Sequence, residues 1–313
     1  MASLSDIQEK LLDTQEFISR LERRLHAHPD SGHLLGNLRS AQKRRRTLER
    51  DFAIEANKVE VDLCSYRLFT EEEGVPSISA FSKTVGDFQV LFSLVYDALK
   101  NGPKERSRLS QEVRNETSLG FGYVFSGSLG MVMTLPNERL LLGETRFDES
   151  IDVIFQMAKA ASASELATFV TKIGRPPVKA IYDWAKAHTD HALGADIEWR
   201  RQEQVRSKLF IQKPELENLR NVIDEMSDET EEEIEVMGEL VGADVRRHTF
   251  HMRPQAGSDI TGRFADAIDA ERTVELPKPY RARLRKTTTF IYSTEEEIEK
   301  YFLLALFPLR EIS

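Results

Sequence analysis

The sequence has a single cysteine, Cys64, and no long run of apolar residues. One cysteine excludes an intrachain disulfide, which is typical of proteins from a reducing compartment. The longest apolar cluster, residues 301–307, is far shorter than the roughly 20 residues that cross a bilayer. Residues 1–6 also lack the basic and apolar regions of a secretory signal. We therefore expect a cytoplasmic protein with no membrane association.

Catalytic motifs are absent as well. Cys64 alternates with apolar residues in a predicted strand, and no neighbour would lower its pKa, so we expect a buried structural thiol. The glycines of residues 120–130 lack the lysine and the following helix that a phosphate-binding loop requires. With 52 acidic residues, no acid–base pair stands out. We predict no catalytic residue, with an enzyme site assembled from distant residues as an alternative.

Two pairs of histidines are spaced three residues apart. His188 and His191 fall in a predicted helix, where this spacing could aim both rings at one metal. Histidines near a helix C-terminus are, however, favoured by the helix dipole alone. His248 and His251 fall in a predicted strand, where such a spacing points side chains to opposite faces. We therefore predict no metal site and no cofactor.

The composition is that of a packed protein, with 313 residues, 40% of them apolar and 30% charged. Predicted strands and helices are mixed without strict alternation, which favours an α+β fold. We divide the chain into a helical hairpin (residues 1–57), an α+β body (residues 58–213) and a C-terminal β-rich domain (residues 214–313). Short strands separated by glycines predict a small β-barrel there, and Thr294 with Glu297 predicts a terminal helix over residues 295–306.

The first 57 residues carry two apolar seams with the spacing of a coiled coil. Positions 4, 7, 11, 14, 18, 21 and 25 alternate steps of three and four, with Thr14 as the one polar interruption. A turn at residues 29–32 separates them from a weaker seam at positions 34, 38, 41, 45, 48 and 52. That seam is weaker because Arg45 sits in its apolar row. We predict an antiparallel two-helix hairpin.

Two such helices cannot bury both seams well by themselves, so a further surface should cover them. The cover could be the body of the chain, a second copy or another protein. Our leading hypothesis is a non-enzymatic binding or assembly protein that forms a homo-oligomer or binds a protein partner through the hairpin. The predicted interface consists of Leu4, Ile7, Leu11, Ile18, Leu21, Leu25, Leu38 and Leu48.

Basic residues supply the alternative hypothesis, a nucleic-acid-binding protein. The net charge of −9 argues against a protein devoted wholly to nucleic acid, but local basic patches could bind phosphate. One patch lies on the second helix of the hairpin, and another on a predicted barrel strand whose alternation puts three arginines on one face. The candidate anion-binding residues are Arg39, Lys43, Arg44, Arg45, Arg46, Arg281, Arg283 and Arg285.

Overall fold

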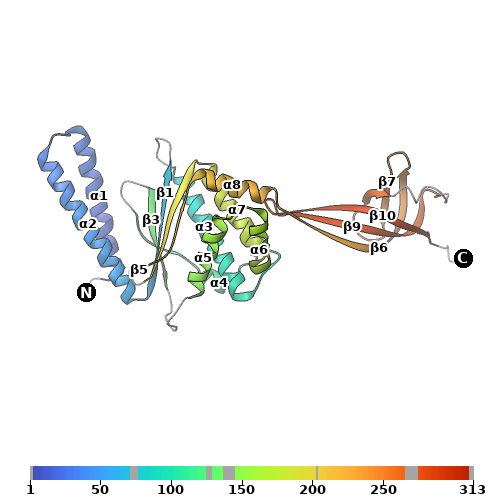
Figure 1. Ribbon diagram of the computed structural model, residues 1–313, viewed down its shortest axis with the longest axis horizontal. Helices are drawn as coiled ribbons and strands as arrows, with labels where there is room; N and C mark the ends of the chain where they lie inside the picture. The colour runs from blue at the N-terminus through green and yellow to red at the C-terminus, as the bar shows by residue number, and fades with distance from the viewer. Residues whose placement is uncertain are drawn as a thin grey trace. The chain divides into compact units, whose positions relative to one another are not determined.

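The computed structural model describes residues 3–70, 77–124, 129–136, 145–201, 204–264 and 274–309. It divides into two compact units, Met1–Glu225 and Met226–Ser313. The first unit contains the eight helices described and a five-stranded sheet, and the second contains a closed five-stranded barrel (Figure 1). The α+β class is therefore confirmed.

The predicted hairpin is formed by α1 (Leu4–Ala27) and α2 (Gly32–Lys58). The side chains of Ser3 and Ser31 cap the two helices by accepting a hydrogen bond from the first turn. Near the turn between the helices, Ile18 and Leu21 pack on Ala41. The two seams therefore face each other, as the spacing predicts.

The sheet of the first unit has the strand order β2-β3-β1-β4-β5, and all its neighbouring strands are antiparallel. The sequence predicts the strand that contains Cys64, which is β1, but not β4 and β5. The strands are β1 (Val61–Thr70), β2 (Gly120–Val124), β3 (Leu129–Pro136), β4 (Leu193–Arg201) and β5 (Gln204–Ile211).

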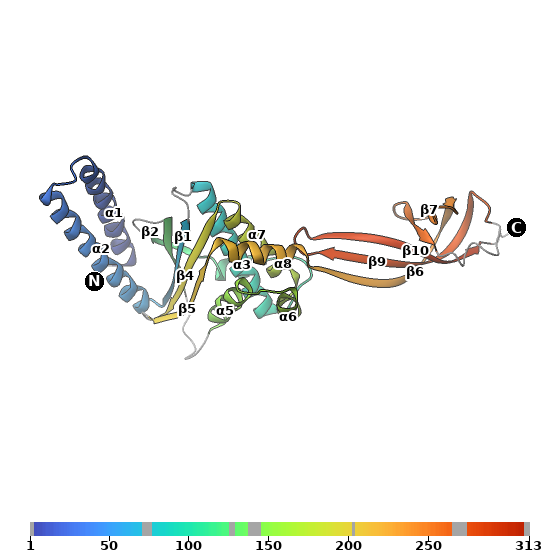
Figure 2. The ribbon, with the colours of Figure 1, turned by 45° about the horizontal axis from the view of Figure 1, so that its top comes forward.

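Six helices complete the first unit: α3 (Ile78–Asn101), α4 (Gln111–Glu116), α5 (Arg146–Ala158), α6 (Ala163–Ile173), α7 (Arg175–Thr189) and α8 (Lys213–Asp224). Figures 1 and 2 show the hairpin on one side of the sheet and α3, α5 and α7 on the other. The helix α8 belongs to this unit because Leu216, Leu219 and Ile223 are fully buried in it. The sequence analysis began the C-terminal domain at residue 214 and so assigned α8 to that domain, whereas the second unit begins at Met226. No helix in the described ranges is long and apolar enough to cross a membrane.

The second unit is the predicted small barrel, with the closed strand order β10-β8-β7-β6-β9. Its core includes Leu240, Phe250, Met252, Leu284 and Leu303. The strands are β6 (Ser227–Asp244), β7 (Thr249–Pro254), β8 (Ile260–Phe264), β9 (Lys278–Ile291) and β10 (Glu296–Pro308).

The terminal helix predicted for residues 295–306 is wrong, because these residues form the end of a turn and most of β10. The strand pairs antiparallel with β9 from Glu296 opposite Ile291 to Pro308 opposite Tyr280. Thr294 and Glu297 match a helix-capping pattern, but that local preference is weak. Pairing with a distant strand and burial of Leu303 in the barrel core override it.

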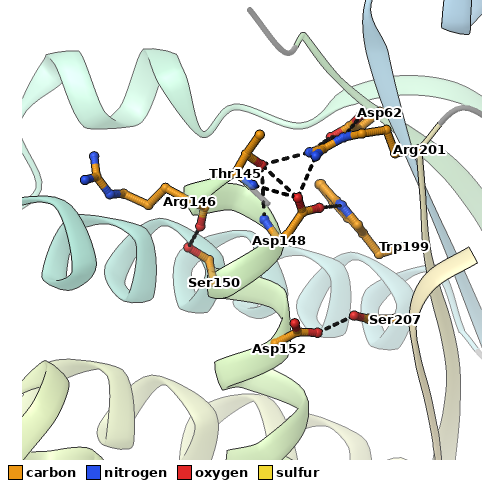
Figure 3. Close-up of polar contacts among 9 residues, drawn as sticks. All are labelled: Asp62, Thr145, Arg146, Asp148, Ser150, Asp152, Trp199, Arg201 and Ser207. Atoms are coloured by element: carbon orange, nitrogen blue, oxygen red, sulfur yellow. Dashed lines mark hydrogen bonds and ion pairs between the residues drawn. The ribbon is translucent and has the colours of Figure 1, made fainter. Parts of the chain in front are cut away.

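A buried ion-pair network fixes the helix-covered face of the sheet (Figure 3). Arg201, at the end of β4, is only 5% exposed and lies 2.7 Å from Asp62 of β1 and 2.5 Å from Asp148 of α5. The indole nitrogen of Trp199 also donates to Asp148. One guanidinium serves two carboxylates, and Asp148 gains further stabilisation from its place in the first turn of α5. The network ties β1, β4 and α5 together.

Replacing Arg201 with methionine should lower the free energy of unfolding by about 3–5 kcal/mol, because two buried carboxylates lose their counter-charge. Urea denaturation followed by tryptophan fluorescence measures this, since both tryptophans, Trp184 and Trp199, lie in the first unit. The control is Arg200→Met, at the neighbouring exposed position, which should change stability by less than about 1 kcal/mol. Equal effects of the two changes would contradict a structural role for the network.

Candidate functional site

A groove of about 610 Å³ lies between α2 and the sheet face that the body helices leave open. Residues of β1, β4 and β5 that alternate with the buried ones form its floor. They are Ser65, Arg67, Asp196, Glu198, Arg200 and Lys208. Arg50, Ala53 and Asn57 of α2 form its wall. The groove is therefore built from segments that are far apart in the sequence.

The floor holds a nearly balanced ion-pair network. Lys208 lies 2.8 Å from Glu198 and 3.4 Å from Asp196, and Arg200 lies 2.6 Å from the other oxygen of Glu198. Partial burial works to raise the pKa of Glu198, but hydrogen bonds from Lys208 and Arg200 hold that pKa below its usual value. Glu198 is thus an ionised hydrogen-bond acceptor at neutral pH, facing an open groove.

The wall of the groove continues along α2 as a stripe of positive charge. Arg39, Lys43, Arg46 and Arg50 recur at steps of four, three and four residues, so they share one face of the helix. All four are exposed, and none forms an ion pair with another residue of the described ranges. We call these four residues the α2 stripe. It extends over about 16 Å at 1.5 Å per residue, and Arg50 joins it to the groove.

Arg45, one of the predicted anion-binding residues, has a different role. Its side chain is buried, lies 2.9 Å from Glu49, and donates to the carbonyl of Val124 and to the side chain of Gln15. These contacts join α2 to α1 and to the edge strand β2. We therefore withdraw the assignment of Arg45 to an anion-binding surface, because its guanidinium is used inside the chain.

Arg44 is exposed but lies outside the α2 stripe. It borders a separate shallow pocket between the two hairpin helices, together with Phe17 and Asp13 of α1. This position follows from the helical repeat, which turns each residue by 100° from the last. Arg44 is therefore not placed to act together with Arg46 on one ligand.

The three barrel arginines share the outer face of β9, as their alternation predicts, but they face carboxylates there. Arg283 lies opposite Glu235 and Arg285 opposite Glu233 in β6. Arg281 lies 3.9 Å from Glu235 and over the ring of Phe307 of β10. The register of β6 against β9 thus balances the charge, which makes this face a weaker candidate for an anion than the α2 stripe.

The predicted interface residues of the hairpin are covered to different extents. Ile7, Leu11, Ile18 and Leu21 are at most 5% exposed. At the base of the hairpin, Ile7 and Leu11 pack with Phe52 and with Tyr123 and Val132 of the sheet. Of the three surfaces that the sequence analysis considered for covering the seams, the body of the chain thus covers the base of the hairpin. The other four, which are Leu4, Leu25, Leu38 and Leu48, are half-buried. Their contact with a partner stays a prediction.

Within the described ranges, no group of three or more His, Cys, Asp or Glu residues could hold a metal ion. His188 is buried, and its Nε2 lies 2.7 Å from the hydroxyl of Tyr66. Burial lowers the pKa of His188 to about 3, with a hydrogen bond to the Leu193 backbone opposing the shift, so the ring is neutral. His191 is exposed. Cys64 is buried, and burial raises the pKa of its thiol.

Sequence reasoning missed the floor of the groove because it did not detect β4 and β5. The signal was present in β4, where Ala195, Ile197 and Trp199 alternate with Asp196 and Glu198. Such a repeat of two residues is typical of a strand with one buried face. Which polar residues meet in the groove depends on the strand register and could not be read from the sequence.

Searches of protein-family models, of curated proteins and of solved structures found no match to this chain.

Replacing Arg45 with alanine should lower the free energy of unfolding by about 1–3 kcal/mol, because buried acceptors lose their donor. Chemical denaturation followed by tryptophan fluorescence measures this. Arg44→Ala is the matched control on the same helix, and it should stay within about 0.5 kcal/mol of the unchanged protein. If Arg45→Ala were as harmless as the control, the contacts of Arg45 would not hold the hairpin.

Proposed function

We propose that this chain is a non-enzymatic binding protein that holds nucleic acid along the α2 stripe and in the adjoining groove. The observation that carries the proposal is the set of four exposed cations on one face of α2 that have no counter-ion in the described part of the chain. The arginines of β9 lie opposite carboxylates of β6, so they would offer less to an anionic partner.

The spacing of the α2 stripe suits a polymer of phosphates. One cation stands on each helical turn, about 5.4 Å from the next along the axis. A partner with regularly repeated negative charge can contact several of them at once and release its condensed counter-ions. A small anion would use only one or two of these cations. An extended phosphate backbone therefore fits the stripe better than a small ligand does.

The acidic charge on the rest of the chain restricts where an anionic ligand can bind. The net charge is −9, and β6 alone carries eight acidic residues and no basic one. Attraction is thus local to the α2 stripe rather than spread over the molecule. We expect binding that weakens steeply as salt is added.

The double variant Lys43→Glu/Arg46→Glu should weaken binding to a 30-nucleotide DNA at about 50 mM salt by at least about tenfold, which corresponds to 1.4 kcal/mol. It should also lower the slope of log affinity against log salt by about 2, because two phosphate contacts are lost. Fluorescence anisotropy with single-stranded and duplex DNA measures both quantities.

The matched control is Arg246→Glu/Arg247→Glu, which changes the net charge equally at the exposed turn between β6 and β7. It should bind DNA like the unchanged protein. Equal losses in the two double variants would show that only total charge matters, and absence of binding by the unchanged protein would refute the proposal.

Self-association through the hairpin is the second candidate, and the exposed ring of Phe17 favours it. Phe17 is 44% exposed and borders the shallow pocket between α1 and α2. Exposed apolar side chains of this size are enriched in protein interfaces. A second copy could bury this ring without opening the seams.

If this candidate holds, light scattering at micromolar concentration should give a mass above that of one chain, 35.8 kDa. Phe17→Glu should then give the mass of a single chain, because burying a carboxylate in the interface without a counter-charge is unfavourable. Glu16→Gln on the same helix is the control and should leave the mass unchanged. A single-chain mass for the unchanged protein would exclude self-association under these conditions.

A further inference from the structure

Two phenylalanines are stacked on the open face of the sheet, next to the charged floor of the groove. The rings of Phe69 in β1 and Phe210 in β5 are 4.9 Å apart between centroids and inclined by 5°. Phe210 is 50% exposed, although its neighbours Leu209 and Ile211 are fully buried on the other face. A large aromatic surface is thus presented on the groove side of the sheet.

The stack depends on a glycine in the strand between the two rings. Phe69 lies opposite Gly194 of β4, and a Cβ atom at that position would overlap the ring of Phe69. Because Gly194 has no side chain, Phe69 can lie across β4 and reach Phe210. The backbone therefore supports the inner ring and leaves the outer ring, Phe210, half exposed.

Charged groups of the groove adjoin this ring. Asp196 lies opposite Phe210 on one side and opposite Arg67 on the other, so the three share one row of the sheet. Lys208 precedes Phe210 by two residues and points to the same face. Lys208 is paired with Asp196 and Glu198, so in this arrangement the ring would stack a base and the α2 stripe would hold phosphates, as aromatic rings and cations do in proteins that bind single strands.

We propose that the nucleic acid in the groove is single-stranded and that one of its bases stacks on Phe210. This inference rests on the proposed function and specifies its ligand. The phosphates follow the α2 stripe, and the bases face the sheet.

The carboxylates of the floor support this orientation. Asp196 and Glu198 would repel a phosphate group, but a carboxylate accepts hydrogen bonds from the amino groups of bases. In a duplex the faces of the bases are stacked inside and cannot meet an aromatic ring, whereas an unpaired base can. The open face of the sheet therefore matches bases, and the α2 stripe matches their backbone.

An acidic peptide is the rival ligand, because it could use the same cations. Polyglutamate, as a model of such a peptide, has no ring system to place on Phe210, and the carboxylates of the floor would repel it. The test therefore includes polyglutamate as a competitor.

The decisive variants are Phe210→Leu, which keeps an apolar side chain without a ring, and Phe210→Trp, which keeps the stacking surface. Anisotropy titrations use a labelled 20-nucleotide single strand and the matching duplex, both at the same salt. Phe210→Leu should weaken single-strand binding by roughly tenfold, in the range of stacking by one base, and should leave duplex binding unchanged. Phe210→Trp should bind the single strand at least as well as the unchanged protein.

The Trp variant also reports contact directly. The two native tryptophans are buried, so quenching of the new, exposed indole on adding the single strand shows a base on residue 210. Thermal unfolding of both variants checks that the sheet is intact. If Phe210→Leu does not fold, quenching in Phe210→Trp still decides the question.

The outcomes separate this inference from the proposed function. Equal binding of single strand and duplex, with no effect of Phe210→Leu and no quenching, overturns the inference and leaves nucleic-acid binding standing. Displacement of the single strand by polyglutamate of equal charge as readily as by unlabelled strand overturns it in favour of a peptide. No binding of any nucleic acid overturns both.

Discussion

Neighbouring arginines in β4 point to opposite faces of one sheet and meet opposite environments. Arg201 is buried between Asp62 and Asp148, whereas Arg200 is half exposed in the groove beside Glu198. The two-residue repeat of the strand imposes this separation. Once Arg201 is held by its two carboxylates, Arg200, Glu198 and Asp196 must face the groove. The buried network thus determines which residues form the groove floor.

A second buried arginine, Arg45, holds α2, which forms the wall of the groove, in position. Arg45 joins α2 to α1 through Gln15 and to the edge of the sheet through the carbonyl of Val124. Gln8 of α1 donates to the same strand, at the carbonyl of Phe121. These bonds satisfy backbone groups at the sheet edge, which would otherwise be open to another strand. They also hold the base of the hairpin, so that Arg50 and Asn57 line the groove.

The sequence was sufficient for two repeats that each belong to one element, although the equally local alternation in β4 was missed. The steps of three and four in α1 predicted the hairpin, and the alternation of Arg281, Arg283 and Arg285 predicted their common face. Prediction from the sequence failed where the interacting residues lie far apart along the chain. The carboxylates Glu233 and Glu235 come to lie opposite Arg285 and Arg283 only through the register of β6 and β9. Arg45 looked like part of a basic patch because Gln15 and the carbonyl of Val124, which accept its hydrogen bonds, lie in other elements.

The strand β10 shows that a local pattern can also predict the wrong element. Thr294 with Glu297 resembles a helix start, and pairing with β9 and β8 together with burial of Leu303 selects a strand. The Phe69–Phe210 stack also escaped prediction, since these residues are separated by more than a hundred positions and meet across Gly194. Residues that act together in a site of this kind are thus identified by topology rather than by spacing along the chain.

The cations of the α2 stripe repel one another along the helix. Arg39 and Lys43, and likewise Arg46 and Arg50, are like charges four residues apart on one helix. Each such pair destabilises a helix by roughly 0.2–0.5 kcal/mol. On the barrel the chain places carboxylates opposite its arginines, so it can balance positive charge where packing requires it. Along α2 the repulsion is left in place, and the stability lost there is supplied by the seams and by Arg45. A polyanion would remove that repulsion on binding, and this relief is a further reason to propose a ligand with repeated negative charge for the α2 stripe.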